Sequence, residues 1–210
     1  MSARAVFLDR DGTIIPETGA RTADPDVEPL PGAIEAVRRL RRAGFLLIVV
    51  TNQSGVARGY YTEAELAVMH ERLLAKFERG GAQIDDLYYC PHHPDEAEIA
   101  EYRRDCDCRK PKPGLLLRAA DEHDIALDAS YAVGDSPRDV AAARAAGCRG
   151  AALILPDQQA TFSLDFTGGP RWEQVVEQMD EASDTSADAV VPDLAAAADW
   201  ILEKETETDG

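Results

Sequence analysis

Short apolar runs alternate along the chain with longer segments in which apolar residues recur every three or four positions. The clearest runs are Ala5 to Asp9 (AVFLD) and Phe45 to Asn52 (FLLIVVTN), and each ends at polar residues. Such runs are typical of strands buried on both faces of a parallel sheet. Further runs predict four more strands, at residues 84–90, 130–135, 150–156 and 188–191.

The segments between these runs carry the signals that begin and end helices. Pro31 and Gly44 bracket one predicted helix, and Thr62 lies three residues before Glu65, a capping box that begins a second helix. Three more helices are predicted at residues 112–125, 136–147 and 192–204. Regular alternation of strands and helices predicts an α/β fold, a Rossmann-like doubly wound parallel sheet with helices on both faces.

One domain is expected to cover residues 1–210, because 45% of the residues are hydrophobic and can bury a full core. The least regular part, at about 156–187, is interpreted as an insertion within that domain. The polar end of the chain, at about 204–210, is expected to be frayed or disordered.

The formal net charge of -17 argues against nucleic acid or an anionic membrane as a partner. The longest apolar run, Phe45 to Val50, is too short to span a bilayer, and the first residues show no signal-peptide pattern. We therefore expect a cytoplasmic protein, acting as a monomer on a small molecule. In a reducing compartment, clustered thiols more often bind a metal than form disulfides.

Several polar residues lie at the ends of predicted strands: Asp9, Thr51, Cys90 and Asp135. In a doubly wound sheet these positions meet at one edge, where ligands bind. Asp9 and Asp11 are separated by one residue and followed by Gly12. Such a pair supplies a nucleophile and a general acid/base, although calcium loops and plain turns share the pattern.

Two other strand ends allow more than one interpretation. The residues from Thr51 to Gly55 (TNQSG) form either an ordinary turn or a group of hydroxyl, amide and backbone N–H donors that binds an anion. Asp135 either caps the helix that follows or joins Asp9 as an oxygen ligand of Mg2+.

Three of the four cysteines lie close together in the sequence, in Cys90-x-His92 and Cys106-x-Cys108. Three thiolates and one imidazole complete the tetrahedral shell of a structural Zn2+ ion, with no open position for catalysis. A disulfide between two of these cysteines and a catalytic thiol are the alternatives. Cys148 is interpreted as a small buried thiol.

Four segments in this order, FLDRDGTII, VVTNQSG, CRKPKPG and VGDSPRD, resemble the four motifs of the haloacid dehalogenase superfamily of phosphotransferases. With CPHHP and CDCRKP, the chain is similar to the heptose bisphosphate phosphatase and histidinol-phosphate phosphatase branch. The resemblance covers roughly residues 5–155 and the terminal ADWIL. Only about twenty residues separate Gly12 from Pro31, so no large cap domain is expected.

The resemblance implies that Asp9 attacks phosphorus to form an aspartyl phosphate and that Asp11 acts as general acid, then as general base. Thr51 and Lys110 would stabilise the phosphoryl oxygens. Catalytic Mg2+ would be bound by Asp9, the backbone carbonyl of Asp11, and Asp135. Asp139 would hold the geometry of its motif or assist the metal through water. Structural Zn2+ would be bound by Cys90, His92, Cys106 and Cys108, with His93 outside the set.

The resemblance also implies the substrate-binding residues, which are Asn52, Gln53, Ser54, Arg109 and Ser136. Ser136 is a departure, since the heptose enzymes commonly carry a basic residue there. By fixing the backbone at Cys108, the zinc loop would aim Arg109 and Lys110 at the phosphate beside Asp9. Lys112 is interpreted as a surface residue.

The expected reaction is Mg2+-dependent hydrolysis of a phosphomonoester, at the 7-phosphate of D-glycero-D-manno-heptose 1,7-bisphosphate, in nucleotide-heptose and lipopolysaccharide precursor synthesis. Histidinol phosphate or another small sugar phosphate is the alternative substrate. A non-catalytic binding module that keeps the fold and its zinc is the remote alternative.

Overall fold

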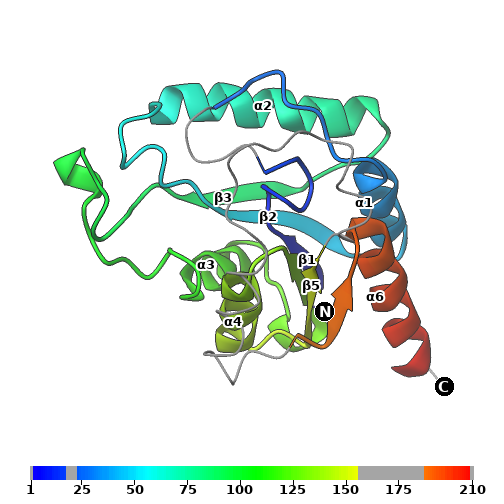
Figure 1. The fold of residues 1–210 in the computed structure, drawn as a ribbon. Coiled ribbons are helices and arrows are strands. Elements are labelled where there is room, and N and C mark those ends of the chain that lie inside the picture. Colours follow the sequence, from blue (N-terminus) through cyan, green and yellow to red (C-terminus); the bar gives the residue numbers. More distant parts are fainter. Residues whose placement is uncertain (1, 18–22, 156–186, 209–210) are drawn as a thin grey trace.

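The computed structural model describes residues 2–17, 23–155 and 187–208, which form one six-stranded parallel sheet flanked by helices (Figure 1). All neighbouring strands are parallel, in the order β3-β2-β1-β4-β5-β6. The strands are β1 (Ala5–Leu8), β2 (Leu46–Asn52), β3 (Asp86–Cys90), β4 (Tyr131–Gly134), β5 (Gly150–Ile154) and β6 (Ala189–Val191). The predicted parallel α/β sheet is therefore confirmed.

The chain enters the sheet at its middle. From β1 it proceeds outward through β2 to β3, then crosses back to β4 on the other side of β1. The pairs Val6–Tyr131 and Leu8–Val133 align β1 with β4, so both strands end at the same height. This reversal of strand order is the topological switch point, where doubly wound sheets bind their ligands. Asp9 and Asp135 follow the two strands that flank it.

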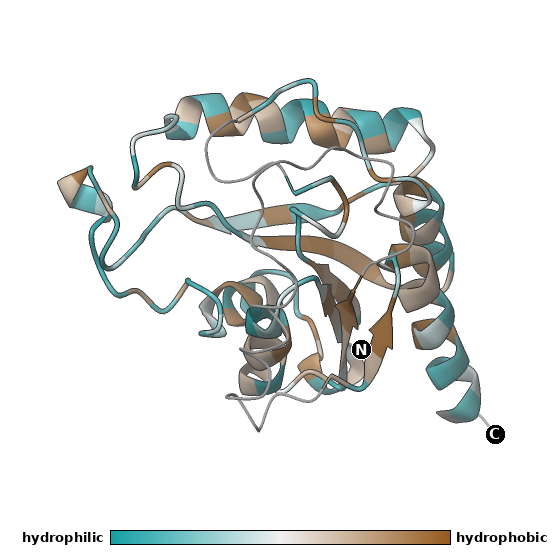
Figure 2. Ribbon diagram, viewed as in Figure 1, coloured by the Kyte–Doolittle hydropathy of each residue, from teal (hydrophilic) through white to brown (hydrophobic). Residues whose placement is uncertain are grey.

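Helices cover both faces of the sheet, as the sequence predicts. One face packs against α1 (Ala33–Arg42), α2 (Glu63–Arg79) and α6 (Leu194–Thr208), and the other against α3 (Gly114–Glu122) and α4 (Pro137–Ala146) (Figure 1). Alternate residues of β1 point to opposite faces, with Val6 and Leu8 in the first core and Ala5 and Phe7 in the second. Both faces are apolar, and Figure 2 shows the central strands in the brown of hydrophobic residues.

The helix signals in the sequence correspond to observed caps. Thr62 and Glu65 form the predicted capping box of α2. At α4 the cap is Ser136, which forms a second capping box with Asp139, so Asp135 is free of the capping role that was its alternative interpretation. The side chain of Asp135 therefore remains available at the sheet edge.

The predicted disorder of the chain end at 204–210 is wrong for its first five residues, because α6 continues to Thr208. Glu205 explains the difference, since it accepts hydrogen bonds from Tyr131 of β4 and pairs with Arg4 and Arg149. Lys204 and Glu207 form a further ion pair along the helix. The contacts of Glu205 anchor the last part of α6 to the sheet, although its sequence is only polar.

The described residues between β1 and α1, 9–17 and 23–32, contain no helix and no strand beyond an isolated bridge between Asp11 and Ile15. The predicted insertion at 156–187 lies outside the described residues except for Ala187. Among the described helices, none is both long and apolar enough to cross a membrane.

Candidate active site

A buried lysine joins two carboxylates at the switch point of the sheet. Lys110 Nζ lies 2.9 Å from Asp9 Oδ1 and 2.5 Å from Asp139 Oδ1, and it also donates to the carbonyl of Val50 at 2.8 Å. Asp9 Oδ1 accepts a second hydrogen bond, from the backbone N–H of Arg10. Two donors therefore fix the orientation of the Asp9 carboxylate before any ligand binds.

Lys110 is held in its charged form although its side chain is almost completely buried. Burial by itself lowers the pKa of a lysine, but the carboxylates of Asp139 and Asp9 outweigh burial here and raise the pKa of Lys110. The lysine is thus a permanent positive charge directed at the sheet edge beside Asp9.

Asp135 completes the group of carboxylates, and we call Asp9, Asp135, Asp139 and Lys110 the carboxylate centre. Ligand oxygens of the three aspartates lie within 4.8 Å of one another. Burial, together with the charges of Asp9 and Asp139, raises the pKa of Asp135 to about 8. A bound cation would reverse this effect, because it favours the ionised carboxylate.

The backbone at Gly12, after β1, lies very close to Asp135, after β4. Gly12 has φ +70°, and a Cβ atom there would lie 2.0 Å from Asp135 Oδ2. Only glycine accommodates both the left-handed backbone and the approaching carboxylate. Mg2+ prefers hard oxygen ligands, such as carboxylate oxygens and backbone carbonyl oxygens. The closely packed carboxylates therefore fit the predicted magnesium site.

Asp11 is held by two side chains, Arg10 and Gln53. Arg10 binds both of its oxygens, Nε to Oδ2 and a terminal nitrogen to Oδ1, each at 3.0 Å. Gln53 donates one amide hydrogen to Asp11 Oδ2 at 2.8 Å and the other to Thr51 Oγ1 at 2.9 Å. The hydroxyl of Tyr61 donates to Gln53 Oε1 at 2.8 Å. Gln53 therefore links Thr51 to Asp11.

The remaining predicted substrate residues lie around this group. Asn52 exchanges two hydrogen bonds of 3.1 Å with the backbone of Lys110, so it holds the lysine loop. Ser54 is buried in the turn after β2. Ser136 caps α4 and accepts a hydrogen bond from the side chain of Arg138. Their contact with a substrate stays a prediction.

The four predicted zinc ligands come together in one cluster, which we call the cysteine cluster: Cys90, His92, Cys106 and Cys108. Their ligand atoms lie within 4.8 Å of one another. Sulfur–sulfur distances of 3.1 to 3.5 Å exclude a disulfide bond among the three cysteines. His92 directs Nδ1 at Cys108 from 3.3 Å, whereas His93 accepts hydrogen bonds from the backbone of its own loop.

The donors of the cysteine cluster fit zinc. Hydrogen bonds with Cys90 and Cys106 lower the pKa of Cys108 to about 5, which favours a thiolate, the form that binds metal. A hydrogen bond to Cys108 and burial raise the pKa of Cys90 in the same cluster. Three soft sulfur donors and one imidazole match a closed structural zinc site.

The cysteine cluster and the carboxylate centre are connected through the backbone. The guanidinium group of Arg109 donates to the carbonyl of His92 at 3.2 Å, and the N–H of Gln53 donates to the carbonyl of Cys90 at 2.8 Å. Lys110, which follows Arg109 in the chain, belongs to the carboxylate centre. Lys112 by contrast is exposed and pairs with Asp105, and Cys148 is buried, as both were predicted.

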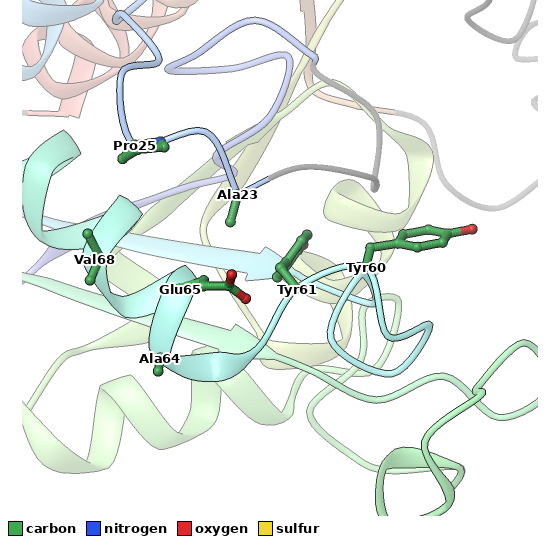
Figure 3. A pocket seen from close by; sticks show the side chains of 7 residues that line it. All are labelled: Ala23, Pro25, Tyr60, Tyr61, Ala64, Glu65 and Val68. Carbon is green, nitrogen blue, oxygen red and sulfur yellow. The ribbon is translucent and has the colours of Figure 1, made fainter.

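A separate cavity of about 570 Å³ lies beside the site, between the β1–α1 segment and the start of α2 (Figure 3). Tyr60 and Tyr61 border it on the loop before α2, and Ala23 borders it from the opposite segment. None of its lining residues belongs to the carboxylate centre, but Tyr61 also bonds to Gln53. The cavity is therefore a neighbour of the catalytic edge.

Three residues of the site were missed by sequence reasoning: Arg10, His70 and Tyr61. Arg10 has only 2% of its surface exposed, and it contacts His70 Nε2 at 2.9 Å. Arg10 was visible as the residue inside the Asp-x-Asp motif. No sequence signal places His70 beside it, because fifty-nine residues separate the two in the chain.

Comparison with known proteins agrees with this geometry. The family model of haloacid dehalogenase-like hydrolases matches residues 19–147. D-glycero-beta-D-manno-heptose-1,7-bisphosphate 7-phosphatase of Escherichia coli K12 is 39% identical over 201 residues, which cover 96% of this chain and 89% of that protein. The protein of the same name from Vibrio cholerae is 44% identical and covers 70% of this chain and 78% of that protein.

Solved structures give the same result. D,D-heptose 1,7-bisphosphate phosphatase from B. bronchiseptica, complexed with magnesium and phosphate, has a TM-score of 0.74 and 32% identity, over 96% of this chain and 99% of that chain. The enzyme of that name from Burkholderia thailandensis has a TM-score of 0.61 and 27% identity, over 95% and 98% of the two chains. These relatives favour an enzyme over a non-catalytic module. The chain belongs to the haloacid dehalogenase-like hydrolases, as a phosphatase.

Proposed function

We propose that this phosphatase removes the 7-phosphate of D-glycero-D-manno-heptose 1,7-bisphosphate with Mg2+ as catalytic cofactor. The observation that carries the proposal is the carboxylate centre at the switch point of a chain 39% identical, over 96% of its length, to an enzyme of that name. The magnesium and phosphate in the B. bronchiseptica structure support the same assignment.

The first chemical step uses the fixed carboxylate of Asp9. One of its oxygens bonds to phosphorus, the bond from phosphorus to the sugar oxygen breaks, and that oxygen takes a proton from Asp11. The charge of Lys110, 2.9 Å from Asp9 Oδ1, offsets the negative charge that collects on the phosphoryl oxygens. The hydroxyl of Thr51, near the end of the neighbouring strand β2, would donate to the same oxygens.

The second step releases phosphate. Water bonds to the phosphorus of the aspartyl phosphate, Asp11 takes a proton from that water, and the Asp9 carboxylate is restored. Mg2+, held by Asp9, Asp135 and the carbonyl of Asp11, would supply positive charge that allows one anion to approach another. Asp139 holds Lys110 in place through its 2.5 Å contact.

A group of arginines favours a substrate with two phosphates. Burial lowers the pKa of Arg109, the charge of Cys90 opposes this shift, and the charges of Arg138 and Arg58 add to it. Arg58 is itself paired with Glu96. Arg138 also contacts Ser136, the position at which the heptose enzymes commonly carry a basic residue. On a protein with a net charge of -17, such a group suits the second phosphate of a bisphosphate.

Zinc is proposed as the second cofactor, bound by the cysteine cluster and structural in its role. The link from His92 to Arg109 supports the hypothesis that the zinc loop aims the catalytic cations. We also propose that the protein is a cytoplasmic monomer of one domain. The free thiols of the four described cysteines fit a reducing compartment.

Steady-state kinetics on heptose bisphosphate and histidinol phosphate, each with Mg2+, test the substrate. The proposal expects a higher kcat/KM for the heptose, and loss of the C7 signal before the C1 signal in phosphorus NMR. A higher kcat/KM for histidinol phosphate would overturn it. Substitution of Arg109 by alanine should raise KM for the bisphosphate more than for p-nitrophenyl phosphate, whereas Arg118→Ala on exposed α3 should change neither.

A further inference from the structure

Arg10, the middle residue of the Asp-x-Asp motif, turns its side chain into the protein. Two of its nitrogens hold Asp11, and the third lies 2.9 Å from His70 Nε2 and 3.2 Å from Met69 Sδ. His70 is buried on the inner face of α2. Helix α2 therefore contacts the Asp-x-Asp motif through the side chain of Arg10.

The chemistry of the two side chains determines the direction of this hydrogen bond. A guanidinium group is always protonated and carries only donors, so His70 Nε2 must be the acceptor. His70 is then neutral, with its proton on Nδ1. Burial, together with the nearby charge of Arg10, lowers the pKa of His70 to about 3, which agrees with a neutral ring.

A buried guanidinium group costs free energy unless its charge is paired and its donors are used. Asp11 pairs the charge of Arg10, and His70 takes a donor that points away from Asp11. With both ends held, the guanidinium plane has little freedom to rotate. The fork that it presents to Asp11 is consequently fixed in direction.

From this arrangement we propose that His70 is a positioning residue: through Arg10 it sets the orientation of the Asp11 carboxylate and hence its transfer of a proton to the departing sugar oxygen. The proposal rests on the role of Asp11 as general acid in the proposed function. Gln53 also donates to Asp11 Oδ2 at 2.8 Å, so loss of His70 should misalign Asp11 and leave it in the site.

The choice of leaving group separates this role from a purely structural one. A sugar oxygen leaves as a basic alkoxide and needs the proton of Asp11 as its bond to phosphorus breaks. The p-nitrophenolate ion is stable without a proton, so its departure depends little on Asp11. The ratio kcat/KM covers the steps up to this departure and leaves out hydrolysis of the aspartyl phosphate, which both substrates share.

The experiment compares His70→Leu, His70→Gln and wild type with Mg2+ and zinc present. His70→Leu should lose about 10- to 100-fold in kcat/KM for heptose bisphosphate and less than about 3-fold for p-nitrophenyl phosphate. His70→Gln, whose amide oxygen can accept from Arg10, should recover most of the loss. His123→Leu is the control, since that histidine pairs with Asp86 on the other face of the sheet.

Equal losses on both substrates, or a glutamine variant no better than the leucine variant, would overturn the proposal. If wild type hydrolyses p-nitrophenyl phosphate and a different sugar phosphate but not the heptose, the proposed substrate fails and the same comparison proceeds with that sugar phosphate. Nitrogen-15 NMR of the wild-type imidazole needs no turnover. It should show an unprotonated Nε2 on His70, and a protonated Nε2 would refute the arrangement.

Discussion

The carboxylate centre and the cysteine cluster lie at the same carboxyl edge of the sheet but are built from different parts of the fold. The carboxylate centre takes Asp9 and Asp135 from the ends of β1 and β4, and Asp139 from the first turn of α4. The cysteine cluster takes only Cys90 from a strand, and its other members come from the loop before α3. Strands and helices thus position the three carboxylates, whereas Lys110, the fourth member of the carboxylate centre, comes from the loop that carries the cysteine cluster.

The two regions also differ in how charge is balanced. In the carboxylate centre, burial and mutual repulsion raise the pKa of Asp135 to about 8 and that of Asp139 to about 6, and one lysine offsets part of the repulsion. In the cysteine cluster, thiols share hydrogen bonds and one of them is readily ionised. The comparison teaches that the first region has the hard oxygen donors and buried charge that suit a cation, and the second the soft donors that suit zinc.

The largest expected effect comes from Asp9, the proposed nucleophile. Asp9→Asn should lower kcat by about 10⁴-fold or more, because the amide cannot form the phosphoryl intermediate. Zinc content, measured by atomic emission, should equal that of wild type, since Asp9 is not part of the cysteine cluster. Asp199→Asn on exposed α6 serves as the control. Wild-type turnover by Asp9→Asn would show that another residue attacks phosphorus.

Removal of a zinc ligand tests the other region. Cys106→Ala should lose zinc and lower Tm by about 10 °C, because the metal contributes several kcal/mol to folding of the loop. The loss of kcat/KM should be smaller than for Asp9→Asn, as the sheet still holds Asp9.

Cys148→Ala is a matched control, because that thiol is buried outside the cluster. It should keep both zinc and activity. A zinc-free Cys106→Ala variant with wild-type Tm and activity would refute the structural role of the metal. It would also refute the hypothesis that the zinc loop orients Arg109.

Acidification should lower the free energy of unfolding because His70 is buried in its neutral form. His70 has a folded pKa of about 3, below its ordinary 6.5. The unfolded chain therefore takes up a proton first as the pH falls, and the stability contributed by neutral His70 is complete above pH 6.5 and lost toward pH 3. At pH 4 the loss is about 3 kcal/mol, at ~1.4 kcal/mol for each pH unit. Urea unfolding of wild type and His70→Gln measures it, and equal slopes would contradict the prediction.

The smallest effect is expected at Lys112, two residues after Lys110. Its side chain is 41% exposed and pairs with the exposed Asp105, so solvent screens the pair. Lys112→Ala should shift Tm by no more than about 2 °C and leave kcat/KM within about twofold. A loss comparable with that of Cys106→Ala would place Lys112 in the phosphate site and weaken the distinction between the two lysines.

Much of the fold and of the candidate site could be predicted from local pattern. The apolar run before Asp9 can be buried only as a strand between helices, and the Thr62 and Glu65 signal begins α2 where it was expected. Strand-end positions alone indicate that Asp9 and Asp135 meet, because parallel strands share one carboxyl edge. The spacing of Cys106 and Cys108 likewise indicates a shared metal.

Tertiary packing decided the rest. Nothing local distinguishes Glu205 from its acidic neighbours, yet its contacts with Tyr131 and Arg4 keep the chain end helical. In the same way, Asn52 donates to the carbonyl of Lys110 and Gln53 donates to Asp11. His70 contacts Arg10. These partners are far apart in sequence, and which of them pair depends on how helices and loops pack.

The sequence by itself determined the α/β class, the order of the motifs and the two sets of candidate metal ligands, because short-range hydrophobic pattern and residue chemistry encode them. Only the tertiary structure decided that Lys110 lies buried between Asp9 and Asp139, and that Arg10 turns inward to His70. The physical reason is burial. The charge of a lysine or an arginine can be buried only where carboxylates and acceptors from distant segments converge on it.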